Sequence, residues 1–149
     1  MADSDLIKLY SGRILELAAD IPRTEPLAQP DATARKRSPL CGSTVSVAVT
    51  LRDGRVAGYS QDVRACALGQ AAAAVTGAAI IGCTEAQVIR ARDQLRAMLT
   101  EDGPVPDAPF AELGVLLPAR EFRNRHASIL LALEAAVEAI AAARASACA

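Results

Sequence analysis

One segment constrains the fold more than any other, because hydrophobic residues in it recur at every second position. The apolar side chains of its first half are Val45, Val47, Val49 and Leu51. Asp53-Gly54 then supplies the dipeptide of a tight turn, and a second apolar run follows through Val63. The pattern predicts an antiparallel hairpin. A sheet of two or three strands is too small to close on itself, so helices must cover its apolar face.

The remainder of the chain predicts helices joined by loops and by one extended arm. Residues 21–40 contain four prolines and a basic cluster, which cannot continue a helix and indicate the arm. A capping box at Thr84 and Gln87 opens a helix that ends near Thr100. Residues 101–109 form a loop, and Pro118 breaks a short apolar stretch over 110–117. The other helices are expected over residues 5–19, 67–82 and 123–144.

These elements predict an α+β fold, with a small antiparallel sheet of two to three strands covered by about five α-helices. We expect a single domain over 1–149, in which 1–40 forms the first helix and the arm and 41–149 forms the core. Hydrophobic residues make up 52% of the chain but aromatic residues only 3%, so the helices are built largely from alanine and aliphatic side chains.

Charge and composition exclude several classes of partner. The chain has 16 basic and 17 acidic residues, which leaves no basic field for nucleic acid or for an anionic membrane. Residues 65–84 carry no charge, but they are rich in alanine and glycine and have little drive to enter lipid. The first residues lack the pattern of a secretory signal, so we expect a cytoplasmic protein with reduced thiols.

Two of the four cysteines flank the predicted hairpin. Cys41 precedes its first strand and Cys66 follows its second strand, and an antiparallel pair brings those two ends together. Cys66 also begins a helix, where the helix dipole and free N–H groups stabilise a thiolate. We therefore expect two thiols at one end of the sheet, with Cys66 the more acidic.

His126 is the only histidine and falls in the first turns of the last predicted helix. A single histidine is more often a core or surface residue than a ligand. Together with two thiolates, however, an imidazole would make a Cys-Cys-His set for zinc or iron that leaves one position open, as reactive metal sites do. The arginines beside it either favour nearby thiolates or form a solvated basic turn.

Four stretches resemble the NifU-like, IscU/SufU-type family of iron–sulfur cluster assembly scaffolds. They are "SPLCGSTVSVAVTLRDGRV", "VRACALGQAAAAVTGAAIIGCT", "LRAMLTEDG" and "FRNRHASILLALEA". The resemblance spans nearly the whole chain, implies a SufE/NifU-like fold, and is greater for the SufU branch because of the segment around residues 100–120.

The resemblance places the first family ligand cysteine on Cys41 and the second on Cys66. The family aspartate falls on Ser43, whose neutral hydroxyl is a poor metal ligand, and the third cysteine falls on His126. The implied metal or cluster ligands are therefore Cys41, Cys66 and His126. Cys41 or Cys66 would be the acceptor of a persulfide, while Cys83 and Cys148 have no counterpart among the family ligands.

The function implied by the resemblance is a scaffold and not an enzyme. It would bind iron or an Fe–S cluster, take sulfur from a cysteine desulfurase and pass the cluster to apo iron–sulfur proteins. Two alternatives remain open at this point. The chain is either a zinc-bound sulfur acceptor, as the SufU branch suggests, or a degenerate relative that binds no metal and acts as an interaction module.

Overall fold

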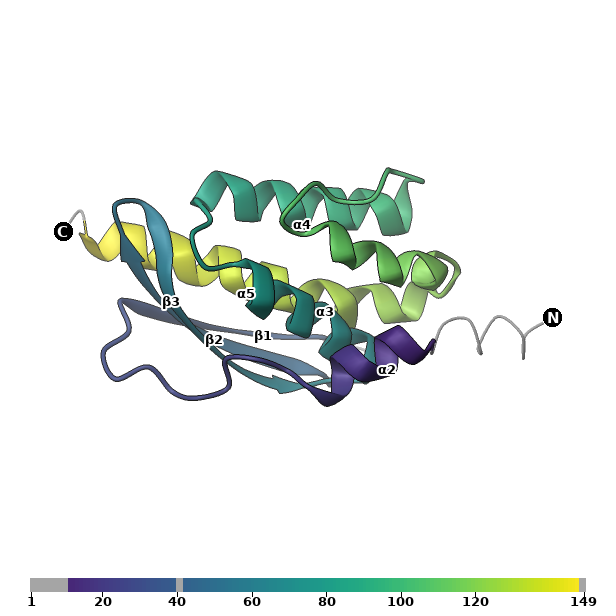
Figure 1. Ribbon diagram of the computed structural model, residues 1–149, viewed down its shortest axis with the longest axis horizontal. Helices are drawn as coiled ribbons and strands as arrows, with labels where there is room; N and C mark the ends of the chain where they lie inside the picture. The colour runs from purple at the N-terminus through teal and green to yellow at the C-terminus, as the bar shows by residue number, and fades with distance from the viewer. Residues whose placement is uncertain (1–10, 40–41, 148–149) are drawn as a thin grey trace.

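The sheet forms one layer of the fold, and the helices stack on one side of it, as Figure 1 shows. The structure is a computed structural model that describes residues 11–39 and 42–147. In chain order the elements are α2 (Gly12–Ala19), β1 (Ala32–Arg37), β2 (Thr44–Arg52), β3 (Arg55–Arg64), α3 (Ala67–Ala79), α4 (Glu85–Thr100), the 3₁₀ helix η1 (Ala111–Glu121) and α5 (Arg123–Ala147). The predicted α+β class, with its small antiparallel sheet, is confirmed.

The sheet has three antiparallel strands in the order β1-β2-β3. The predicted hairpin is present: β2 and β3 are joined by Asp53 and Gly54, both with positive φ. A bulge between Thr50 and Leu51 adds a residue to β3, so that Val56 and Tyr59 are both buried although they are three positions apart.

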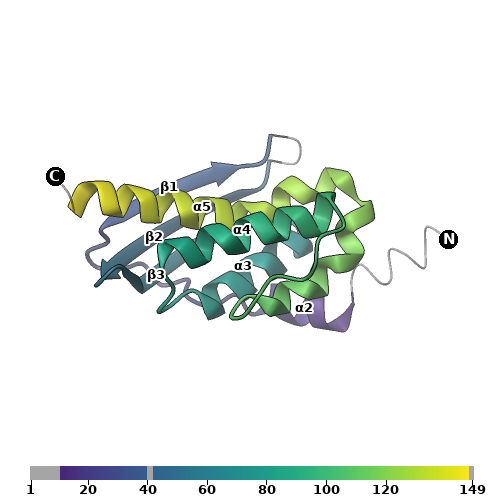
Figure 2. The same cartoon turned by 90° about the horizontal axis from the view of Figure 1, so that it is seen from above.

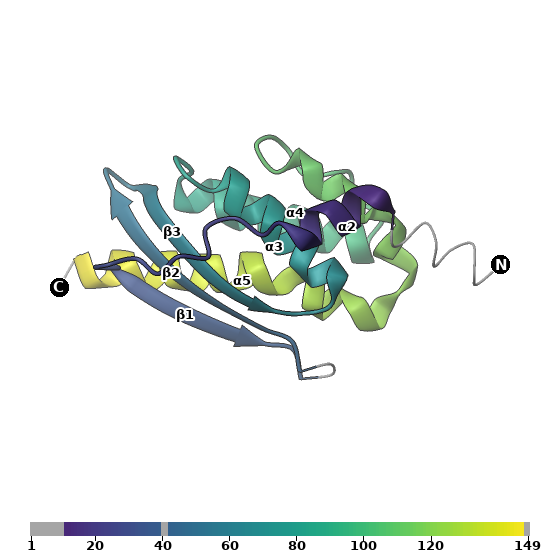
Figure 3. The same cartoon turned by 60° about the horizontal axis from the view of Figure 1, so that its bottom comes forward.

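The extended arm contributes the third strand. Its last part, β1, pairs with β2 from Ala32 opposite Val49 to Arg37 opposite Thr44. The preceding residues run along β3 (Figure 3), where the backbone N–H of Gln61 donates to the carbonyl of Arg23 at 2.9 Å. The Gln61 amide also donates to the carbonyls of Pro22 and Ala73, so it fixes the arm to α3.

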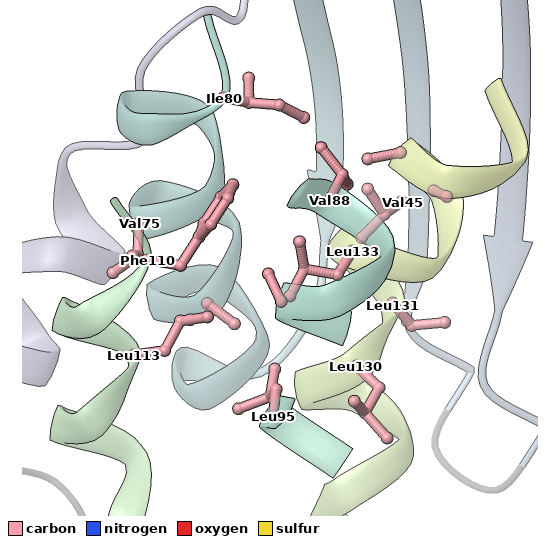
Figure 4. Close-up of a cluster of buried hydrophobic side chains, with 14 of the residues drawn as sticks. Val45, Val75, Ile80, Val88, Leu95, Phe110, Leu113, Leu130, Leu131 and Leu133 are labelled. Atoms are coloured by element: carbon pink, nitrogen blue, oxygen red, sulfur yellow. The ribbon is translucent and has the colours of Figure 1, made fainter. Parts of the chain in front are cut away.

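The apolar side of the sheet packs against α3 and α5, and α4 lies beside α5 (Figure 2). Val45 from β2, Val88 from α4 and Leu133 from α5 belong to one buried cluster, part of which is drawn in Figure 4. α3 is mostly buried, as its small residues predicted. Its glycines allow close approach: a Cβ on Gly77 would lie 2.5 Å from the Gln61 amide nitrogen.

Two helix predictions differ from the structure in detail. The first helix is described only from Gly12, with Ser11 as its N-cap, and the predicted start at residues 5–10 lies outside the described residues. Pro118 does not end the stretch after Phe110, because it is contained within the 3₁₀ helix η1, which continues to Glu121. Short i→i+3 turns tolerate a missing N–H better than a long α-helix does.

α5 is long and apolar enough to cross a membrane by length and composition alone. However, 67% of its most apolar window is buried inside the fold, as is usual for a core helix. Residues 65–84, whose lack of charge first raised the question of a span, form the 13-residue helix α3 together with its flanking turns.

The capping box at the start of α4 gives a test of the fold. The Thr84 hydroxyl accepts from the backbone N–H of Gln87, and the Gln87 side chain accepts from the N–H of Thr84. Thr84→Ala should lower the free energy of unfolding by about 1 kcal/mol in urea denaturation. The control is Thr100→Ala at the other end of α4, where an exposed hydroxyl donates to the Arg96 carbonyl, and the expected loss is within about 0.5 kcal/mol. Equal losses in both variants would contradict the capping role.

Candidate functional site

The ends of all three strands meet at one end of the sheet. Arg37, Thr44 and Arg64 lie side by side across the strands, so β1 and β3 end where β2 begins (Figure 3). The segment between β1 and β2 is closed by two hydrogen bonds, from the Ser38 N–H to the Ser43 carbonyl at 2.8 Å and from the Gly42 N–H to the Ser38 carbonyl at 2.9 Å. Cys41 belongs to this segment but lies outside the described residues.

Cys66 lies at the same end, two positions after the end of β3. It is the N-cap residue of α3, with extended backbone angles that present its side chain beside the free N–H groups of the first turn. The side chain is partly exposed, and the thiol is free. This is the position that the sequence predicted for it.

The surroundings of Cys66 favour its thiolate. Burial by itself would raise the pKa of the Cys66 thiol. Four neighbouring groups act in the opposite direction and outweigh this effect, so the pKa of the Cys66 thiol lies below its ordinary value. In order of size they are the backbone N–H of Gly69, the Ser128 hydroxyl, the backbone N–H of Leu68 and the positive charge of Arg125. The lowered pKa agrees with the predicted effect of the start of α3, while the predicted difference from Cys41 stays a prediction, since Cys41 lies outside the described residues.

Ser128, on the first turns of α5, is the residue that sequence reasoning missed. Its hydroxyl oxygen lies 3.5 Å from the Cys66 sulfur and donates to the Ser43 hydroxyl at 3.2 Å. The contact joins the start of α3, the start of β2 and the start of α5 at one point. A serine on an apolar helix face belongs to no recognisable sequence motif. The one sequence feature that could have indicated a role for Ser128 is its position two residues after His126.

His126 is buried near the start of α5 and its Nε2 donates to the Ala119 carbonyl at 2.9 Å. A carbonyl oxygen only accepts, so Nε2 carries the proton and the lone pair of the neutral ring is on Nδ1. Metal-binding histidines commonly use their second nitrogen in this way. The hollow that His126 lines includes Asp102, Arg120 and Glu121, and Cys66 is not among its lining residues.

Two of the arginines near His126 have different roles. Arg120 donates to the carbonyls of Met98 and Gly103, so it anchors the loop after α4 rather than facing the thiol. Arg125 contributes its charge to Cys66. Within residues 11–39 and 42–147, no group of three or more His, Cys, Asp and Glu side chains is placed to hold a metal ion.

Cys83 provides a contrast to Cys66 within the same fold. It is buried, its thiol donates to the Ala79 carbonyl at 3.4 Å, and burial raises its pKa despite the nearby charge of Arg55. The sequence indicated no role for Cys83, and its surroundings are those of a packed core residue.

Comparison with known proteins identifies the family. Among solved structures, the N-terminal part of a nitrogen-fixing NifU-like protein from Brucella abortus is 41% identical with a TM-score of 0.92, and the match covers 95% of this chain and 98% of that one. The chain therefore belongs to the NifU-like family, as its motifs indicated.

More distant structures share the fold. A putative iron–sulfur cluster assembly scaffold protein for the SUF system from Fervidobacterium islandicum AW-1 is 16% identical with a TM-score of 0.80, and the match covers 89% of this chain and 96% of that one. A hypothetical protein is 17% identical with a TM-score of 0.79, over 95% of this chain and 99% of that one. No family model and no curated protein matches the sequence.

The contrast between the two described thiols can be measured by alkylation. In variants that keep only Cys66 or only Cys83, the rate of reaction with iodoacetamide should rise with pH as each thiolate forms. A lowered pKa places the midpoint for Cys66 below that of an ordinary thiol, whereas Cys83, which is 3% exposed, should react slowly at every pH because the reagent cannot reach it in the folded protein. A midpoint for Cys66 at or above that of an ordinary thiol, a Cys83 thiol that reacts as fast as Cys66, or a Cys66 midpoint unchanged in 6 M urea (roughly the concentration that unfolds a small domain), would contradict the proposed environment.

Proposed function

We propose that this protein is an iron–sulfur cluster assembly scaffold that receives sulfur on a cysteine and holds iron or a cluster as cargo at the end of the sheet. The observation that carries the proposal is Cys66, a partly exposed N-cap thiol with a lowered pKa at the point where the sheet and two helix starts meet. Membership of the NifU-like family and the fold shared with a SUF-system scaffold support the same role.

Sulfur would arrive by thiol exchange with a cysteine desulfurase. The Cys66 thiolate attacks the terminal sulfur of the desulfurase persulfide, a new S–S bond forms on Cys66, and the desulfurase cysteine leaves as a thiolate. The rate of such an attack depends on the thiolate fraction, which the N–H groups of Gly69 and Leu68 increase at Cys66. Cys41 is the alternative acceptor.

Iron would bind through Cys66, Cys41 and His126. Thiolate and imidazole both suit iron, and the bond from His126 Nε2 to the Ala119 carbonyl leaves Nδ1 as the nitrogen that would ligate. Ser43 stands at the family aspartate position, and its hydroxyl brings no charge to a cation. Such an incomplete set suits cargo that must be released to apo iron–sulfur proteins.

Anaerobic purification and analysis test this function. The protein as isolated, or after incubation with ferrous iron, L-cysteine, a cysteine desulfurase and a dithiol reductant that supplies the two electrons needed to reduce persulfide sulfur to sulfide, should contain iron and sulfide and show sulfur-to-iron charge-transfer absorption. Cys66→Ala should lose most of the bound iron, and His126→Ala should lower it, whereas Cys83→Ala serves as the control and should leave it unchanged.

Each other result has a definite meaning. Zinc without sulfide, with persulfide still formed on the chain, would identify a zinc-bound sulfur acceptor and overturn cluster assembly. No metal and no sulfur transfer in the intact protein would identify an interaction module. Iron content that His126→Ala leaves unchanged would remove the histidine from the ligand set and reduce the site to its thiols.

A further inference from the structure

Ser128 occupies the space between Cys66 and Ser43. Its oxygen is 3.5 Å from the Cys66 sulfur and 3.2 Å from the Ser43 oxygen, and both serines are buried, with 1% and 6% of their surfaces exposed. A serine in a helix commonly bonds back to a carbonyl one turn earlier. This one reaches across to Ser43, the residue before β2, and to Cys66, the N-cap of α3.

Packing fixes the Ser128 hydroxyl in this position. A Cβ on Gly69 would lie 2.6 Å from the Ser128 hydroxyl oxygen and 3.1 Å from the Ser128 carbonyl oxygen, so the first turn of α3 lies against α5 with no room for a side chain at Gly69. Only glycine leaves room for the hydroxyl at this place. The orientation of Ser128 is therefore built into the contact between the two helices.

A hydroxyl has one proton to donate and two lone pairs that accept. Beside a protonated Cys66, Ser128 accepts from the S–H and donates to Ser43. When the sulfur is bound to a metal ion it has no proton and is only an acceptor. The Ser128 proton then turns toward the sulfur, and the Ser43 hydroxyl is close enough to donate to Ser128 in its place.

We infer that Ser128 is a positioning residue for the sulfur of Cys66, resting on the function proposed above. Its hydroxyl, supported by Ser43, donates a hydrogen bond to the Cys66 sulfur whenever that sulfur holds metal. A hydrogen bond to a ligating sulfur fixes its orientation and withdraws electron density from it, which alters both metal affinity and sulfur-to-metal charge transfer. Ser128 thus acts on the cargo through Cys66 and not as a ligand.

Cobalt(II) is the probe, because its thiolate complexes absorb strongly while the metal stays in one oxidation state. The full chain is titrated anaerobically with Co²⁺ as wild type, Ser128→Ala, Ser43→Ala and Ser46→Ala. Ser46 is the matched control, because it is on β2 and three positions from Ser43, so it projects to the opposite face. Cys66→Ala measures the share of the charge-transfer band that belongs to Cys66.

Ser128→Ala should move the sulfur-to-cobalt band to longer wavelength, because no hydrogen bond then withdraws electron density from the Cys66 sulfur. It should also weaken Co²⁺ binding roughly tenfold, because the orientation of the sulfur is no longer fixed. Ser43→Ala should shift the band in the same direction by less, and Ser46→Ala should leave it in place. Ser43→Ala also keeps the test open if Ser128→Ala fails to fold.

The outcomes separate this inference from the proposed function. A wild-type band that depends on Cys66 but keeps its position in both Ser128→Ala and Ser43→Ala overturns the positioning role alone. A band that Cys66→Ala leaves at full intensity overturns it as well, because the absorbing sulfur is then a different one. No charge-transfer band in the wild type overturns metal binding by the proposed site and, with it, this inference.

Discussion

The contact between the start of α3 and the start of α5 is the interaction on which the site depends. Gly69 has no side chain, so the first turn of α3 lies against Ser128. That approach brings the N-cap thiol of Cys66 to a hydroxyl of α5, and it brings α5 to the start of β2, next to Ser43. Three elements distant in sequence are thereby held at one corner, and the chemistry of the thiol is set by groups from each of them.

The sheet supplies the rigidity that this corner needs. β3 leads directly into the N-cap of α3, and β1 and β2 are joined by a segment closed at Ser38 and Ser43. α5 covers β1 and β2 along much of its length, so its first turns cannot move away from the strand ends without disturbing the core. A partly exposed thiolate can be held firmly because the groups around it are fixed by packing elsewhere.

Local patterns made most of the fold predictable from the sequence. The alternation of Val45, Val47 and Val49 with the Asp53-Gly54 turn is a local signal, and the capping box at Thr84 is another. β1 was predicted only as extended chain, because Ala32–Arg37 has no large apolar face of its own and becomes a strand by pairing with β2. η1 was predicted only in part, since Pro118 ends an α-helix but not a 3₁₀ helix.

The part of the candidate site that could be predicted from the sequence is the part built from a residue with a reactive side chain. Cys66 was predicted because the dipole and free N–H groups of a helix start act on any thiol placed there, and its position and pKa direction agree with that prediction. Ser128 was not predicted, because a serine among leucines and alanines matches no functional motif, and its role depends on a contact with Cys66, which is distant in sequence. The ligand roles of Cys41, Cys66 and His126 stay predictions.

The most direct test of the proposed function is to incubate the protein with a cysteine desulfurase and L-cysteine and to locate the transferred sulfur by peptide mass mapping. We predict one additional sulfur atom on Cys66, or on the alternative acceptor Cys41. Sulfur found only on Cys83 or Cys148, or on no cysteine of a folded protein, would contradict it.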